Sequence, residues 1–365
     1  MVRYNEAGTP WHLWLLALLL SLAPAVALMC AANLLRGQDT SAQEPGAAAP
    51  ANADRRITLD VVVTDRSGKP VRGLQQQDFT LLDNKKPQTI LSFREAGGRD
   101  KNADPPLQAI VVIDAINDGY RNVASEREQL KRFLRQGGGE LPLPMSLISF
   151  PDKSKAQPLT TRDGNALADT LNSNNPGIRS FTNSQGIYGA EERDQISVRT
   201  LEQLVAYEAQ QPGRKLLIWL GVGWPLLSAE GNGMPGRDSA ALFHNVVWLS
   251  TKLREGRITL YNVDPGLSGA YYYEQFLKGV GSAKIVQDGN LGLQVLAIQS
   301  GGLVLNRSND MGDSMASCLE DAKAYYTLTF DSAAAGHADE YHSLQVKIDK
   351  PRLTAHTRTG YYAQP

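Results

Sequence analysis

The stretch AIVVIDAINDGYRN, residues 109–122, joins an apolar run to a single acid and then to a polar turn. The run from Ile110 to Ile113 predicts a buried strand that carries Asp114 to its C-terminal end, and Asn117-Asp118-Gly119 predicts a turn. Many α/β proteins place a metal or substrate site at the C-terminal end of such a strand. Asp114 is therefore either a candidate metal ligand or what remains of a metal site.

From about Pro105 onward the chain alternates between strand and helix patterns. Expected strands include 215–221 and 258–264, and expected helices include 195–210 and 239–255. A further helix is expected from Ser125 to Arg135, opened by a capping box of Ser125 and Glu128. The alternation predicts an α/β domain over residues 105–324, with a doubly wound, mostly parallel sheet and helices on both faces.

Outside this region only strand patterns are found. Residues 55–98 alternate apolar and polar side chains, with the apolar positions from Ile57 to Val63 on one face. Residues 325–365 contain three more runs of this kind, YYTLTF, YHSLQVKID and LTAHTR. Because a two-stranded hairpin is marginal alone, we expect the N-terminal and C-terminal strands to pair into one small β module.

The N-terminal segment predicts export. Arg3 precedes a run from position 11 to 35 that contains no acid, lysine or arginine. The run fits a signal peptide cleaved after Ala25-Val26-Ala27, and it fits a retained membrane anchor equally well. Residues 1–36 are therefore a signal peptide or anchor, and residues 37–54 are an Ala/Pro/Gln-rich linker expected to be disordered. We expect a periplasmic, secreted or membrane-anchored protein that contacts the membrane only through this segment.

Composition and motifs favour a protein without enzyme activity. The chain has 365 residues, 21% of them charged, and a net charge of −1, so nothing indicates nucleic acid as a partner. Its two cysteines, Cys30 and Cys318, form no CxxC pair, and none of the five histidines has a second His, a Cys or an acid at ligand spacing. The sequence has no nucleophile elbow, phosphate-cradling loop or dinucleotide fingerprint, so it nominates no catalytic residue.

The order of elements resembles the von Willebrand factor type A (VWA) domain, whose first strand leads into the Asp-x-Ser-x-Ser motif of a metal-ion-dependent adhesion site. Four segments sharpen the likeness to the VWFA-related acidobacterial domain family. They are VVVTDRSGKPVRGLQQQDFTLLDNKKPQTILSF, GRKLLIWLGVGWP, YNVDPGL, and YYTLTF…YHSLQVKI…RTGYYA. The resemblance runs from about Ile57 to Ala363 and implies a VWA-like fold.

Carried over position by position, the resemblance implies a degenerate metal site. Asp114 matches, but Ile116 has no oxygen at the next ligand position, and Asp118 is an acid in place of a hydroxyl. Thr182 could supply the loop hydroxyl, whereas the stretch 221–223 offers glycines where an Asp is expected. Mg²⁺ needs near-octahedral oxygen ligands. We therefore expect no cofactor; the alternative is Mg²⁺ held by Asp114, Asp118 and Thr182. Without a metal, Asp114 would cap neighbouring backbone N–H groups.

Ligands of open α/β sheets bind beyond the C-terminal strand ends. The loops expected there span 115–122, 174–194, 221–237 and 265–273. Aromatic residues in these loops could anchor a partner or pack over the glycine-rich turns. The predicted partner-binding face comprises Asp114, Asn117, Asp118, Thr182, Trp224, Tyr271, Tyr272 and Tyr273.

These features predict an exported, non-enzymatic, VWA-like binding or adhesion protein whose partner is another cell-envelope or extracellular protein. The alternatives are a metal-dependent VWA adhesion domain with an atypical site and a cell-envelope hydrolase. A hydrolase would need a nucleophile and a base, for which the sequence offers no pair.

Overall fold

The computed structural model describes residues 55–96, 106–150, 159–173, 186–224, 239–264, 271–306 and 310–365. These residues belong to one compact unit that spans Pro50–Pro365. The expected signal peptide or anchor (1–36) and linker (37–54) lie outside the described residues. Within the described segments, no helix has the length and apolar character that crossing a membrane requires.

A six-stranded sheet forms the centre of the α/β part, with the order β10-β9-β8-β5-β6-β7. Its strands are β5 (Leu107–Asp114), β6 (Glu140–Phe150), β7 (Thr161–Asp163), β8 (Arg214–Leu220), β9 (Ile258–Val263) and β10 (Val304–Leu305). All neighbours pair in parallel except β6 and β7. The sequence-based prediction of an α/β chain with a mostly parallel sheet is thus confirmed.

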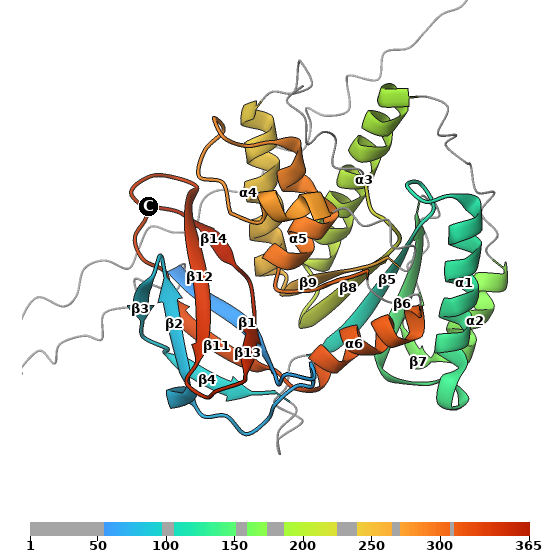
Figure 1. Ribbon diagram of the computed structural model, residues 1–365, viewed down its shortest axis with the longest axis horizontal. Helices are drawn as coiled ribbons and strands as arrows, with labels where there is room; N and C mark the ends of the chain where they lie inside the picture. Colours follow the sequence, from blue (N-terminus) through green and yellow to red (C-terminus); the bar gives the residue numbers. More distant parts are fainter. Residues whose placement is uncertain are drawn as a thin grey trace, which may run out of the picture. The chain divides into compact units, whose positions relative to one another are not determined.

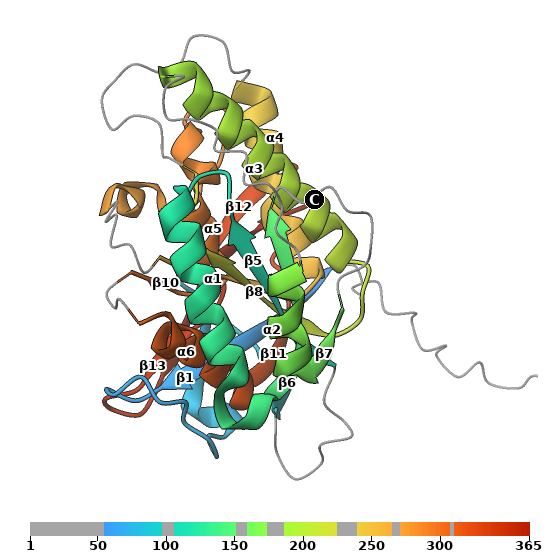
Figure 2. The same ribbon diagram turned by 90° about the vertical axis from the view of Figure 1, so that its right-hand side faces the viewer.

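β5 lies in the interior of the sheet because both of its faces are apolar. Val111 and Ile113 pack into a core under one face, while Ile110 and Val112 pack into a second core under the other. Helices α1, α2 and α6 cover the first face, and α3, α4 and α5 cover the second (Figures 1 and 2). Their bounds are α1 (Tyr120–Arg135), α2 (Gly164–Ser173), α3 (Gly186–Glu208), α4 (Ser239–Glu255), α5 (Leu293–Gln299) and α6 (Met311–Lys323).

Helix α1 begins five residues earlier than the local sequence signal predicts. Its N-cap is Gly119, not Ser125, so the capping-box prediction is wrong. Val123 is buried in the core beside β5, and tertiary packing of this kind extends a helix beyond its local cap signal. The longer helix brings a turn with a buried acid, Glu126, next to the end of β5.

Strands from the two ends of the chain pair directly with each other. One four-stranded sheet has the order β13-β1-β11-β4 and the other has the order β14-β12-β2-β3. These strands are β1 (Arg56–Thr64), β2 (Phe79–Asp83), β3 (Lys86–Gln88), β4 (Ser92–Glu95), β11 (Tyr326–Asp331), β12 (Glu340–Ile348), β13 (Thr354–His356) and β14 (Gly360–Ala363). In Figure 1 the blue N-terminal strands lie beside the red C-terminal ones. We call these two sheets the β module.

The C-terminal end contributes four strands, one more than the sequence pattern predicts. The additional strand, β14, is too short to show an alternation, yet all four of its residues are buried. Tyr361 points into the core of the β module, whereas Tyr362 packs edge-to-face against Phe243 of α4 at 6.0 Å between ring centroids. β14 therefore joins the β module to the α/β part.

Removing residues 324–365 should expose the N-terminal strands. β1 would lose β11 and β13, and β2 would lose β12, which leaves too little paired strand for independent stability. We expect the backbone amides of β1 to lose their protection in hydrogen-exchange mass spectrometry. A chain ending at Ala363 is the matched control, because it keeps every strand. Unchanged protection of β1 in the shorter chain would show that the pairing is dispensable.

Candidate functional site

The predicted site lies where the strand order of the sheet reverses. From β5 the chain continues to β6 on one side, whereas β8 flanks β5 on the other. Asp114 is the last residue of β5, and Gly221 follows the last residue of β8. Open α/β sheets bind ligands at such a switch point, beyond the C-terminal strand ends.

The carboxylate of Asp114 is fully buried and is satisfied by the protein's own N–H groups. Its Oδ1 accepts hydrogen bonds from the backbone N–H groups of Ile116 and Asn117, both at 3.0 Å. Its Oδ2 accepts from Nδ2 of Asn117 at 2.8 Å and from Nε1 of Trp219 at 3.0 Å. Burial raises the pKa of Asp114, and these hydrogen bonds oppose the rise. Asp114 therefore acts as a cap of the strand end.

Trp219 of β8 closes the site from the side opposite to α1. Its ring is fully buried between Phe150, at 5.8 Å between centroids, and Trp224, at 5.5 Å. Trp224 is only 2% exposed and donates its indole N–H to the backbone oxygen of Leu291 at 2.8 Å. The prediction of Trp224 as an aromatic anchor on the partner-binding face is therefore wrong, because its side chain is part of the core.

Two glycines make the turn after β8 possible. Gly221 has φ of 115°, and a Cβ there would lie 3.2 Å from both Cβ of Asp114 and Oδ2 of Asp118. Gly223 has φ of 72°, and a Cβ there would meet Leu293 at 2.7 Å. The VWA resemblance places an Asp ligand in this turn. The chain has glycine there instead, and its backbone passes close to Asp114 and Asp118.

A second buried acid, Glu126 of α1, lies beside Asp118. Burial raises the pKa of Glu126 to about 9, and the negative charges of Asp118, Asp114 and Asp264 contribute to the rise. Glu126 is 2% exposed, and with a pKa of about 9 it is neutral at pH 7, where it shares a hydrogen bond with Asp118. Within the described part of the chain, its Oε2 atom has no hydrogen-bond partner. The sequence pattern did not single out Glu126, because it opened the helix at Ser125 and so gave no sign that this turn lies beside the end of β5.

Asp118 is only half-buried and is held by groups from both sides of the site. Its Oδ1 accepts from Nδ2 of Asn122 at 2.7 Å and from the N–H of Gly119 at 3.1 Å. Its Oδ2 lies 3.4 Å from the backbone N of Val222, in the turn after β8. The loops after β5 and β8 are thus linked through one carboxylate.

The remaining predicted site residues are placed only in part. Asn117 lies at the site, where its Nδ2 also donates to Oγ of Ser197 on α3 at 2.9 Å. Thr182 lies outside the described residues, so Ser197 is the α3 hydroxyl that the structure brings to the site. Tyr271, Tyr272 and Tyr273 form part of a 3₁₀ helix, η7 (Tyr271–Phe276); Tyr273 is half-buried, and the side chains of the other two lie outside the description.

Within the described residues, no group of three or more His, Cys, Asp and Glu side chains is arranged to hold a metal ion. Asp114 offers no free oxygen to a metal ion, because both of its carboxylate oxygens already accept hydrogen bonds from N–H groups of the protein. Asp118 and a protonated Glu126 are the acids that remain beside it. Mg²⁺ would have to displace N–H donors from Asp114 and a proton from Glu126 before it could bind these carboxylates.

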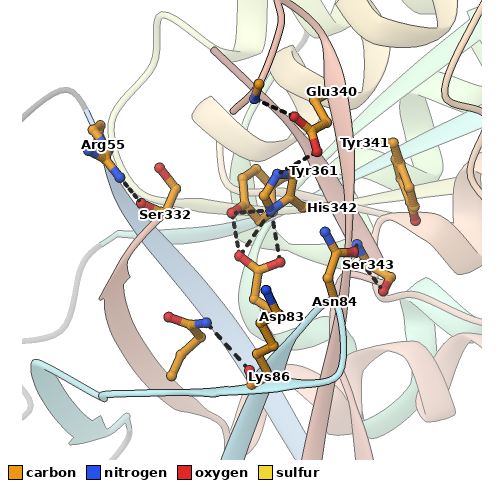
Figure 3. A network of polar contacts seen from close by, with 12 residues as sticks. Arg55, Asp83, Asn84, Lys86, Ser332, Glu340, Tyr341, His342, Ser343 and Tyr361 are labelled. Carbon is orange, nitrogen blue, oxygen red and sulfur yellow. Dashed lines mark hydrogen bonds and ion pairs between the residues drawn. The ribbon is translucent and has the colours of Figure 1, made fainter. Parts of the chain in front are cut away.

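A second polar cluster lies in the β module and bears on the hydrolase alternative (Figure 3). Nδ1 of His342 lies 2.9 Å from Asp83, and the hydroxyl of Tyr361 donates to Asp83 at 2.6 Å. Sequence spacing could not nominate Asp83 as the partner of His342, because the two residues are 259 positions apart. All three side chains are buried, and the adjacent Ser343 hydroxyl contacts Asn84 instead. The cluster ties β2, β12 and β14 together.

Comparisons with known proteins leave the family of this chain open. No protein-family profile and no curated protein matches the sequence. Among solved structures, the crystal structure of the human COPII-coat protein Sec24c is similar over 74% of this chain, with 10% sequence identity and a TM-score of 0.35. The match covers 46% of that chain, so this protein spans less than half of it. At this level of similarity no property of Sec24c transfers to this protein.

Replacing Glu126 with Gln should stabilise the protein increasingly as the pH rises. Glu126 keeps its proton up to about pH 9 when folded but loses it near pH 4.5 when unfolded, so the wild type loses stability between these values. An amide cannot ionise in either state. The gain should grow from pH 5 to pH 8 by up to about 1.4 kcal/mol per pH unit, measured by urea unfolding.

The matched control for this series is Glu128→Gln, on the same helix but in an exposed pair with Lys131. The Lys131 ammonium lowers the pKa of Glu128, so this change should not stabilise the protein at high pH. Parallel pH profiles for Glu126→Gln and the wild type would contradict the assignment of a neutral Glu126.

Divalent metal should leave the melting temperature unchanged. Because Asp114 is saturated by N–H donors and Glu126 is protonated, we expect neither EDTA nor millimolar Mg²⁺ to shift the Tm. A metal present at a hundredfold excess over its dissociation constant would add about 2.7 kcal/mol of stability, which scanning fluorimetry detects. An upward shift with Mg²⁺ that Asp118→Asn abolishes would instead establish a metal site.

Proposed function

We propose that this chain is an exported, non-enzymatic, VWA-like binding protein that recognises another cell-envelope or extracellular protein through the C-terminal edge of its central sheet. The proposal includes kinship with the VWFA-related acidobacterial domain family, which rests on the motif order from Ile57 to Ala363. Export rests on the uncharged run between positions 11 and 35.

The main support for the proposal is that both carboxylate oxygens of Asp114 are already hydrogen-bonded within the protein. A catalytic carboxylate or a metal ligand needs at least one oxygen that can reach a substrate, a water or an ion. Both oxygens of Asp114 are instead used by Ile116, Asn117 and Trp219. The position that the resemblance assigns to metal-dependent adhesion therefore serves to hold the edge of the sheet rigid, which suits recognition by contact.

An aromatic side chain that the sequence pattern passed over favours this edge as the contact surface. Tyr120, the first residue of α1, is 63% exposed and directly follows the turn that carries Asp118. Arg121 and Asn122 are exposed beside it. An exposed tyrosine with polar neighbours on a rigid turn matches the composition of binding hot spots, in which Tyr and Arg are enriched. Tyr120 thus replaces Trp224 as the proposed anchor.

Replacing Tyr120 with Ala should weaken partner binding without unfolding the protein. Removing a central aromatic anchor costs about 2 kcal/mol, which is roughly a thirtyfold loss of affinity. The partner would be captured from envelope extract with the full chain as bait, identified by mass spectrometry and titrated against each variant. The matched control is Tyr207→Ala, because Tyr207 is 44% exposed near the end of α3, at the opposite edge of the sheet from Tyr120. Equal losses for both variants, or none for Tyr120→Ala, would overturn the proposed surface.

A further inference from the structure

A small, partly open pocket lies between the β module and the α/β part, and most of its charged wall is arginine. Thr58, Leu59, Asp60, Arg254, Arg257, Ile258, Thr259, Ser300 and Arg358 line it. The wall thus carries three arginines against one carboxylate, an excess of two positive charges. We call this cavity the arginine pocket. Four chain segments line it: β1, the stretch from the end of α4 to the start of β9, Ser300 directly after α5, and the residues just before β14.

The single carboxylate is already engaged by one of the arginines. Arg257 binds Asp60 through two nitrogens, with Nε at 3.1 Å from Oδ2 and the second contact to Oδ1. Thr327 donates to the same Oδ1 at 3.2 Å. Arg257 reaches Asp60 from a left-handed backbone conformation, with φ of 50°. Asp60 therefore neutralises Arg257 and leaves the other two guanidinium groups without a carboxylate at hydrogen-bonding distance.

Arg254 and Arg358 have few protein acceptors for their N–H groups. A guanidinium carries five N–H donors. In the part of the chain that the structure describes, Arg358 makes one hydrogen bond, from NH1 to the backbone oxygen of Ser250 at 3.2 Å. Over the same residues, the nearest acid to Arg254 is Glu255, whose Oε1 lies 3.8 Å from NH2, beyond hydrogen-bonding distance.

Burial makes this shortage costly. Arg358 is only 7% exposed, and desolvation followed by the charge of Arg254 lowers the pKa of its guanidinium to about 9. Arg358 is therefore still charged at pH 7. A poorly solvated charge is stabilised by a counter-charge or by water. Within the described residues, the unpaired N–H atoms of Arg254 and Arg358 are not among the fully buried ones, so solvent or an anion can reach them.

The size of the cavity limits what can fill it. Its volume of about 20 Å³ is enough for one water-sized sphere. A space of this size suits a single halide ion better than a phosphate, a sulfate or a peptide carboxylate. The excess of positive charge and the unused N–H donors favour an anion over a neutral water.

We propose that the arginine pocket binds one chloride-sized monovalent anion between the guanidinium groups of Arg254 and Arg358. The anion accepts their N–H groups and offsets the charge that Asp60 leaves unbalanced. Because β1, α4 and the chain before β14 all line the pocket, the anion stabilises the contact between the β module and the α/β part.

The first test is thermal unfolding of the purified full chain in sodium chloride or sodium bromide, against sodium gluconate at the same ionic strength. Equal ionic strength keeps screening constant, and gluconate is too large for the cavity. A halide at tenfold excess over its dissociation constant should raise the Tm by about 2–4 °C, and the rise should saturate. Equal Tm values in halide and gluconate at every concentration would overturn the proposal.

Variants separate this pocket from other halide effects. Arg254→Gln should abolish the halide-dependent rise, and it is expected to fold because the Arg254 side chain is partly exposed. Arg358→Gln should do the same where it folds. Arg66→Gln removes an exposed arginine in a turn and should keep the full rise. A rise that persists in Arg254→Gln would place the halide elsewhere and overturn the proposal.

The second test locates the ion directly. Crystals of the full chain soaked in sodium bromide should show an anomalous peak within about 3.5 Å of the Arg254 and Arg358 nitrogens. Anomalous peaks only at surface positions, or a water in the pocket that bromide does not replace, would contradict the assignment.

Discussion

The carboxylate of Asp114 is the constraint on which the C-terminal edge of the sheet depends. A carboxylate at the end of a strand buried on both faces must find its hydrogen-bond donors within the protein, because water does not reach it. The chain supplies them from the loop after β5, through Ile116 and Asn117, and from β8, through Trp219. The turn after β8 must then pass close to the same carboxylate, which requires glycine at position 221. One carboxyl group thus holds the strand end, the turn and the indole ring in place.

Glu126, the second buried acid, is stabilised differently from Asp114, because it keeps its proton. Glu126 lies near Asp114, Asp118 and Asp264, so an ionised form would face three negative charges in a poorly solvated place. Protonation removes the charge and provides a donor for Asp118. The acids at this edge thus resemble a cation site in composition, although Asp114 already accepts hydrogen bonds from the protein and Glu126 keeps a proton. The motif comparison found failed ligands for a different reason: Ile116 and the glycines at 221 and 223 carry no side-chain oxygen.

The sequence alone was sufficient for features set by local pattern. Four apolar residues from Ile110 to Ile113 predict β5, and the strand-helix alternation predicts the covered parallel sheet, because burial on two faces requires such patterns. Features set by long-range packing were not accessible. The start of α1 at Tyr120 depends on the burial of Val123 against the sheet, and the burial of Trp224 depends on a contact with Leu291. The pairing of His342 with Asp83 joins residues 259 positions apart, which no spacing rule can find.

The charge clusters at the end of β5 and in the arginine pocket differ in how they can be neutralised. At the end of β5 the excess charge is negative. Glu126, whose pKa is about 9, keeps its proton at pH 7 and so adds no negative charge there. In the arginine pocket the excess is positive, and the pKa of Arg358, although lowered to about 9, still lies above pH 7. An acid with that pKa is neutral in the folded protein, whereas a base with the same pKa remains charged. Loss of a proton therefore does not balance the pocket at neutral pH, which is in keeping with the anion proposed there.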